Sequence, residues 1–97
     1  MANFMTNKPL PIEKEAVAFL KFPDLEVLSS NDDIKIRSSN LERALKLGNI
    51  EHDKIKIIFE DNQGLKQVNT TIWGVTDKRI ILKKGVVIPI NRIHDVI

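Results

Sequence analysis

The side chains that first suggest chemistry are two His-Asp dipeptides, His52-Asp53 and His94-Asp95. If the strand that closes the chain lies beside the strand starting at Ile55, the two histidines converge and could hold a metal ion or exchange protons. A metal site needs three or four ligands, and adjacent strand residues point to opposite faces, so each dipeptide offers one ligand in a given direction. We therefore expect exposed turn residues and no bound metal, with a metal site at His52 and His94 as the alternative.

A second pair of acids, Asp32-Asp33, follows three residues typical of turns, Ser29 to Asn31. The two carboxylates of a hydrolytic pair lie across a cleft, whereas serine, asparagine and aspartate in a row usually bond their own backbone in a turn. The 4 glycines lie singly and form no loop that could cradle a phosphate. The sequence thus predicts no catalytic group and no cofactor, and a protein that is not an enzyme.

Basic side chains are the candidates for binding an anionic partner. The chain carries 15 Lys and Arg against 13 Asp and Glu, and the net charge of +2 falls wholly in residues 50–97. This small surplus permits contact with nucleic acid without requiring it. For an RNA partner we expect the contacts to come from Lys54, Lys56, Lys66 and Arg79.

Trp73, the only tryptophan, directly precedes Gly74. It is either a core residue that fills the domain or a binding hot spot for a partner. A bulge at Gly74 would switch the face on which Trp73 lies, so strand alternation leaves both interpretations open.

These side chains must be positioned by a short polypeptide of 97 residues, which is the length of one domain. It has no cysteine, which fits a reducing compartment, and no apolar run near the roughly 20 residues that span a bilayer. The first residues lack the apolar segment of a signal peptide. We expect a cytoplasmic domain without a membrane partner.

The first half of the chain predicts a helical cover. Residues 1–11 should form an irregular arm, and apolar residues at helical spacing predict a helix over 12–21. Residues 25–28 and 34–37 resemble the strands of a hairpin. A second short helix should begin after Ser39 or Asn40, either of which can cap it, and end at Gly48-Asn49.

From Ile50 onward the apolar pattern becomes that of strands. Alternation predicts a strand from about Ile55, followed by a turn over 61–64 and a long strand that bends at Gly74. Three more short extended runs follow, and Pro89 belongs at a sheet edge because it cannot donate a ladder hydrogen bond. Four to five short strands with frequent turns predict a small antiparallel barrel.

The apolar runs 80–82 and 86–88 exceed what one barrel interior can hold, because both strand faces are apolar. The outward residues need a cover, either the N-terminal helices or a second copy of the chain. The candidates for this second layer, and for a homodimer, are Ile58, Ile81 and Val87.

The order LERALKLG, DKIKIIFEDNQG, TTIWGVTDKRIILKKG and VVIPINRIHDV resembles the Rof/RNase P subunit-like superfamily of small SH3-like barrels. Rof proteins bind and inhibit the terminator Rho, and the archaeal RNase P protein of this fold binds RNA. A weaker resemblance, over VTDKRIILKKG and IPINRIHDV, is to bacterial PH-like domains, which usually end in a long helix. The chain stops at Ile97 without that helix, which favours the smaller barrel.

The sequence therefore predicts a single α+β, mainly β domain over 1–97. Residues 50–97 should form an SH3-like barrel of four to five strands, and residues 1–49 an arm with short helices and a hairpin packed against it. The resemblance implies a non-enzymatic binding or regulatory module that acts on a protein or RNA of the transcription or RNA machinery. The alternative is a homo-oligomerising structural module or a PH-like protein-interaction domain that binds no nucleic acid.

Overall fold

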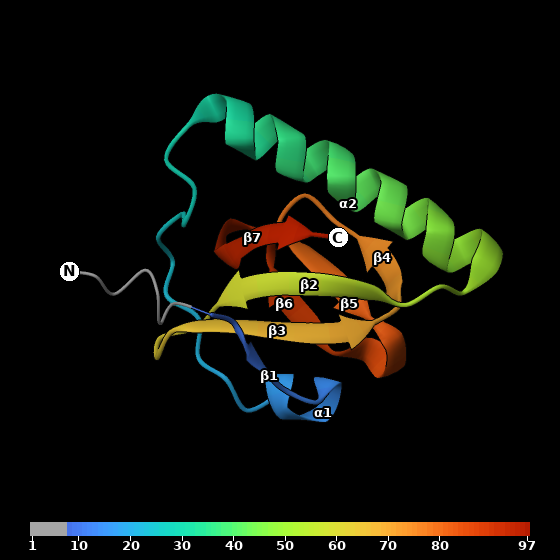
Figure 1. Cartoon of the computed structure of the whole chain (residues 1–97), viewed down its shortest axis with the longest axis horizontal. Coiled ribbons are helices and arrows are strands. Elements are labelled where there is room, and N and C mark those ends of the chain that lie inside the picture. Colours follow the sequence, from blue (N-terminus) through green and yellow to red (C-terminus); the bar gives the residue numbers. More distant parts are fainter. Residues whose placement is uncertain (1–7) are drawn as a thin grey trace.

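A computed structural model describes residues 8–97 of the chain (Figure 1). It combines one long helix with seven strands in two sheets, ordered β1-β3-β2-β7 and β4-β5-β6. The elements in chain order are β1 (Leu10–Pro11), α1 (Lys14–Val17), α2 (Asn31–Glu51), β2 (Ile55–Glu60), β3 (Leu65–Thr70), β4 (Ile72–Val75), β5 (Arg79–Leu82), η2 (Lys83–Gly85), β6 (Val87–Pro89), η3 (Ile90–Arg92) and β7 (Ile93–Val96). The predicted α+β, mainly β fold is confirmed, but residues 50–97 form six strands instead of the predicted four to five, and their closure into a barrel is not shown.

The strands of the second half follow the alternation in the sequence. Ile55, Ile57 and Phe59 of β2 are buried, while the residues between them are half-buried. The predicted turn over 61–64 is present, and Gly64 takes a φ of 144°, which is open to glycine but strained for other residues. The Asp61 side chain fixes this turn by accepting the backbone N–H groups of residues 63 and 64.

The bend at Gly74 is also confirmed. The β4–β5 register shifts between Ile72 and Gly74, so two residues of β4 stand opposite one of β5. Thr71 alone separates β3 from β4, and the chain passes there from the first sheet into the second. Within residues 8–97 no ladder joins the two sheets, which lie as two layers around the core.

The predicted hairpin over 25–37 and the separate helix after Ser39 or Asn40 are wrong. Residues 31–51 form one helix of 21 residues, α2, which Ser30 caps by accepting the Asp33 N–H at 3.0 Å. Asp32 and Asp33 lie in its first turn, where negative charge suits the helix dipole. Gly48 does not end α2 but lies against β4.

The first helix is also shorter than predicted. Residues 14–17 form α1, and Val17 is its one buried residue, whereas the prediction was a helix over 12–21. Of the predicted arm, residues 1–7 lie outside the described part, and β1 pairs in parallel with β3. Residues 8–30 are therefore mostly irregular chain.

The two open sides of the sheet layers receive different covers (Figure 1). α2 crosses one side, where it packs on β7 and β4. α1 lies on the opposite side, and the irregular chain of residues 18–30 runs from it past the left-hand end of the strands to the start of α2. We call residues 17–26 the N-terminal strap, because hydrogen bonds and side chains tie this stretch across the sheets at several points.

Candidate functional site

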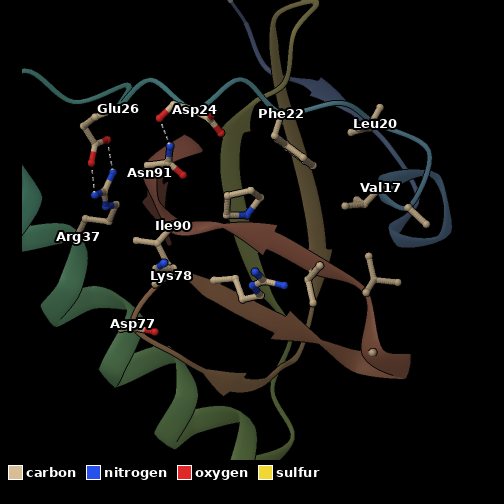
Figure 2. Close-up of a pocket in the computed structure, with 16 residues that line it drawn as sticks. Val17, Leu20, Phe22, Asp24, Glu26, Arg37, Asp77, Lys78, Ile90 and Asn91 are labelled. Carbon is tan, nitrogen blue, oxygen red and sulfur yellow. Dashed lines mark hydrogen bonds and ion pairs between the residues drawn. The ribbon is translucent and has the colours of Figure 1, made fainter.

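A groove of about 830 Å³ lies between the N-terminal strap and strand β6. Figure 2 shows the strap along its upper side and β6 with the β4–β5 turn along its lower side. Half of its lining residues are apolar: Val17, Ala18, Leu20, Phe22, Val86, Val87, Pro89 and Ile90. The other half includes six charged side chains and Asn91, and a cavity of this size that combines apolar walls with polar groups is typical of a binding site.

Strand β6 presents a free edge to this groove. Leu82 N–H donates to the Val86 carbonyl at 2.7 Å, and Ile90 N–H donates to the Lys78 carbonyl at 2.9 Å. Since alternate residues of an antiparallel strand face the partner strand, the backbone groups of Val87 and Pro89 must face away from β5. Within residues 8–97 no other strand pairs with β6 on that side.

The predicted position of Pro89 at a sheet edge is confirmed, because β6 is an edge strand of the β4-β5-β6 sheet. Its missing N–H lies on the side away from β5, so no ladder hydrogen bond is lost. The free edge therefore offers one N–H, from Val87, and two carbonyls, from Val87 and Pro89. Unpaired backbone groups on an edge strand are a template for another strand.

The outer face of the same sheet is apolar beside the groove. Ile81 and Val87 are cross-strand neighbours, and Arg79 lies opposite Pro89. Ile80 and Ile88, which alternate with them, are fully buried in the core. Val87 remains 39% exposed, so the strap leaves its side chain in reach of a ligand.

A fixed ion pair forms one end of the groove. The Arg37 guanidinium donates to both Glu26 carboxylate oxygens at 2.6 Å, and also to the Ile93 carbonyl at 3.0 Å. The hydrogen bonds from Arg37 hold the pKa of Glu26 below its ordinary value, although its partial burial acts in the opposite direction. Glu26 therefore stays ionised at neutral pH and serves to hold α2 against the strap (Figure 2).

Further polar contacts hold the strap at this end. Asn91 Nδ2 donates to the Asp24 carbonyl at 2.6 Å, and Val27 N–H donates to the Asn91 carbonyl at 2.9 Å. Buried Arg92 donates to the Leu25 carbonyl at 2.7 Å. The walls of the groove are thus fixed by contacts that do not use the free edge of β6.

The four predicted basic residues do not form one surface. Lys54 and Lys56 lie near the start of β2, beyond the C-terminal end of α2, whereas Arg79 lines the groove near Arg37 in the N-terminal part of that helix. The stretch of α2 from residue 37 to residue 51 is about 21 Å long. Lys54 and Lys56 are therefore at the other end of the domain from Arg79.

Lys66, the fourth of them, is buried and already paired. Its ammonium lies 2.9 Å from the Asp61 carboxylate, and its side chain is only 11% exposed. Burial would raise the pKa of Asp61, but hydrogen bonds from Lys66 and from two backbone N–H groups outweigh it and lower that pKa. Lys66 thus stabilises the β2–β3 turn and is not available to an RNA phosphate.

Of the predicted apolar candidates, the structure brings Ile81 and Val87 together and places Ile58 elsewhere. Ile58 is half-buried on β2 of the other sheet, between Gln67 and Asp95. Trp73 is 52% exposed at the β4 bulge, directly before the residue that pairs with Ile81. Trp73 is therefore not a core residue, and the interpretation as a surface hot spot is the one that its position allows.

The two histidines do not converge, and His94-Asp95 is half-buried in strand β7 instead of lying in the predicted exposed turn. His94 Nε2 lies 2.9 Å from Glu60 Oε1 within a charged cluster that also includes Arg92. His52 ends α2 in a left-handed conformation with a φ of 56°. In the described part of the chain no group of three His, Cys, Asp or Glu side chains could hold a metal ion.

The strap and Arg37 were missed by sequence reasoning. A signal for Arg37 exists in the spacing of Arg37, Leu41, Ala44 and Gly48, which follow one helix face and are all buried. Because two of these four residues, an arginine and a glycine, are not apolar, the spacing of apolar residues along the helix does not reveal this face. No helix of residues 8–97 is long and apolar enough to cross a membrane.

Comparisons with protein-family models, with curated proteins and with solved structures find no match to this chain.

Proposed function

We propose that this chain is a non-enzymatic protein-interaction module that binds an extended segment of a partner protein in the groove beside β6. The observation that carries the proposal is the free edge of β6, which faces a groove with apolar side chains on both of its fixed walls. An extended peptide that lies along such an edge gains main-chain hydrogen bonds, and pockets on either side receive its alternate side chains.

The size and lining of the groove support this mode of binding. One N–H and two carbonyls on the edge of β6 can exchange hydrogen bonds with an added strand. Apolar side chains on both walls, from Val17 and Leu20 to Val87, exclude water around those bonds. A ligand with apolar residues at alternate positions meets both features.

A protein partner also agrees with the resemblance to Rof-like modulators, some of which act on proteins. The cysteine-free sequence favours a cytoplasmic location for such a module. An RNA partner has less support, because Lys54, Lys56 and Arg79 lie apart and Lys66 is paired with Asp61. A homodimer in which β6 pairs with β6 of a second copy would use the same edge, so the experiment must distinguish it from peptide binding.

The proposal is tested by selecting random nine-residue peptides, displayed on phage, against the whole chain. We expect enriched peptides with apolar residues at alternate positions, and amide chemical-shift changes centred on β6 when a synthetic enriched peptide is added to the ¹⁵N-labelled protein. Light scattering at the same protein concentrations checks that the shifts do not come from self-association. Shifts confined to another surface would refute the proposal, as would the failure to enrich any peptide.

Two variants of one residue isolate the backbone contact. Val87→Ala removes most of the side chain and keeps the N–H, whereas Val87→Pro removes the N–H as well. Val86 has φ −70° and ψ 140°, a conformation compatible with a following proline. We expect the proline variant to bind an enriched peptide about tenfold more weakly than the alanine variant, which corresponds to one lost hydrogen bond. Equal affinities of the two variants would contradict strand addition.

A further inference from the structure

Arg79 occupies a position in the groove from which it can choose among partner segments. It is the first residue of β5 and lies opposite Pro89, so its side chain shares the outer sheet face with Ile81 and Val87. It is exposed, and no ion pair is formed by its guanidinium within residues 8–97. A long side chain at this point can pass over the small ring of Pro89 and reach a strand added beyond β6.

The other charged groups of the groove divide into two sets. Glu26 and Arg37 neutralise one another at the end of the groove and are not free to select a ligand charge. Asp24 and Asp77 line the same polar end of the groove, at the strap and at the β4–β5 turn, on the left in Figure 2. Val17 and Leu20 lie at the opposite end in that view.

The balance of charge is therefore local and does not make the groove a basic patch. The two negative charges of Asp24 and Asp77 balance the two positive charges of Lys78 and Arg79. This balance argues against recognition of a highly charged polyanion. Arg79, however, lies opposite the apolar ring of Pro89, which shields an ion pair formed there from water on one side. Charge-assisted hydrogen bonds between guanidinium and carboxylate are short and strong under such conditions.

We infer that Arg79 makes this module select partner segments that carry one acidic side chain with an apolar residue two positions away from it. The inference rests on the proposed strand addition at β6. Because side chains alternate along an added strand, the acid and the residues two positions away lie on one face. That face continues the outer sheet surface, where an acid opposite Pro89 meets Arg79 and the residue two positions away lies opposite Val87.

The experiment compares parallel selections of the same peptide library against the parent chain, Arg79→Glu and Lys83→Glu. Lys83 is an exposed lysine in the turn after β5 and does not line the groove. Lys83→Glu therefore changes the net charge by the same amount as Arg79→Glu, but outside the proposed binding site. We expect the parent and Lys83→Glu to enrich Asp or Glu at one fixed position, and Arg79→Glu to enrich Lys or Arg at that position. Thermal melting of each variant checks that it is folded.

A single enriched peptide then gives the magnitude. We expect replacement of its acid by glutamine to weaken binding to the parent about five- to tenfold, as for a charge-assisted contact that is partly exposed. A version of the peptide with lysine in place of the acid should bind Arg79→Glu more tightly than it binds the parent. Raised salt should reduce the difference in affinity for the parent between the acid and glutamine peptides.

The outcomes separate the inference from the function on which it rests. If peptides are enriched and move the amides of β6, but show no acid preference or show the same preference with Arg79→Glu, the inference is wrong and strand addition stands. If no peptide is enriched by any of the three proteins, or binding leaves β6 unchanged, the proposed function fails and the inference fails with it.

Discussion

Gly48 provides the sharpest test of how α2 packs on the sheets. A Cβ atom at this position would lie 2.5 Å from the Ile72 carbonyl oxygen and 3.0 Å from Thr71 Cγ2. The nearer atom belongs to the backbone of β4 beside a side chain that is fully buried, so it cannot rotate away. The Gly48→Ala variant must therefore displace α2 or bend β4.

Two opposing effects decide the sign of the change. In the middle of a helix, alanine is favoured over glycine by about 1 kcal/mol. Overpacking a well-filled contact typically costs about 1 to 3 kcal/mol, and a backbone atom at this distance places Gly48 at the upper end. We expect Gly48→Ala to lower the free energy of unfolding by about 1 to 2 kcal/mol, and the melting temperature of a domain this size by about 8 °C.

Asn49→Ala is the matched control, because Asn49 is the next residue of α2 and is exposed. It gains helix propensity without a clash, so its free energy of unfolding should rise by about 0.5 kcal/mol. Urea titration and calorimetry measure both variants. If Gly48→Ala were as stable as Asn49→Ala or more so, α2 would not approach Ile72 as described, and the assignment of this helix as the cover of β4 would be wrong.

Three further perturbations test other parts of the fold. Ser30→Ala removes the acceptor of the Asp33 N–H and should lower the free energy of unfolding by about 1 kcal/mol; an unchanged urea midpoint would contradict the helix start at residue 31. Because the pKa of Asp61 is lowered in the folded chain, its stabilisation is complete above the ordinary value of 3.8 and is lost as pH falls through the lower folded value. Asp61→Asn should reduce that acid-side slope and, by leaving the Lys66 ammonium without its partner, cost about 3 kcal/mol at neutral pH, whereas parallel stability–pH curves would refute the role of the pair. Pro89→Ala gives the free edge of β6 a second N–H and should increase self-association with concentration in light scattering, and a strictly monomeric variant would show that proline does not protect this edge.

The β-rich half of the fold could be predicted because its local signals agree with one another. Alternation in β2, the turn after Asp61, the bulge at Gly74 and the edge position of Pro89 each depend on residues close together in the chain. Each is enforced by backbone geometry that few other residues satisfy. Tertiary contacts did not need to override any of them.

The helical half could not be predicted in the same way. The buried face of α2 contains Arg37 and Gly48 beside only two apolar residues, so its period is weak. Ser39 and Asn40 resemble a helix cap but lie inside the helix, while the true cap is Ser30. The helix is fixed by its packing on β4 and β7, which are 20 or more residues away in the sequence.

The groove could not be predicted because its two walls come from opposite ends of the chain. The strap contributes residues 17–26 and the sheet contributes residues 77–91. Asn91 and Arg92 bond to the carbonyls of Asp24 and Leu25, pairs that are each separated by 67 residues. Trp73 illustrates the same limit, since the bulge that sets its face depends on the register with β5.

The way in which the strap is held explains why the groove stays open. Its backbone and side chains bond to the first sheet and to the ends of strands, as when Asn62 N–H donates to the Lys21 carbonyl at 2.9 Å. Phe22 packs against Phe59 of β2, with ring centroids 6.0 Å apart. Among the described residues none of the strap's backbone groups bonds to β6, although β6 has groups to offer.

A strap that is held at Lys21, Phe22, Asp24 and Leu25 cannot move across to close the free edge of β6 without losing these contacts. The space beside β6 is therefore present before any ligand arrives. A partner segment would then lose its own freedom on binding, while the module loses little, which favours affinity for a short segment. The same anchoring keeps Arg79 and the edge of Val87 on one side of the domain, where a single extended segment can meet both.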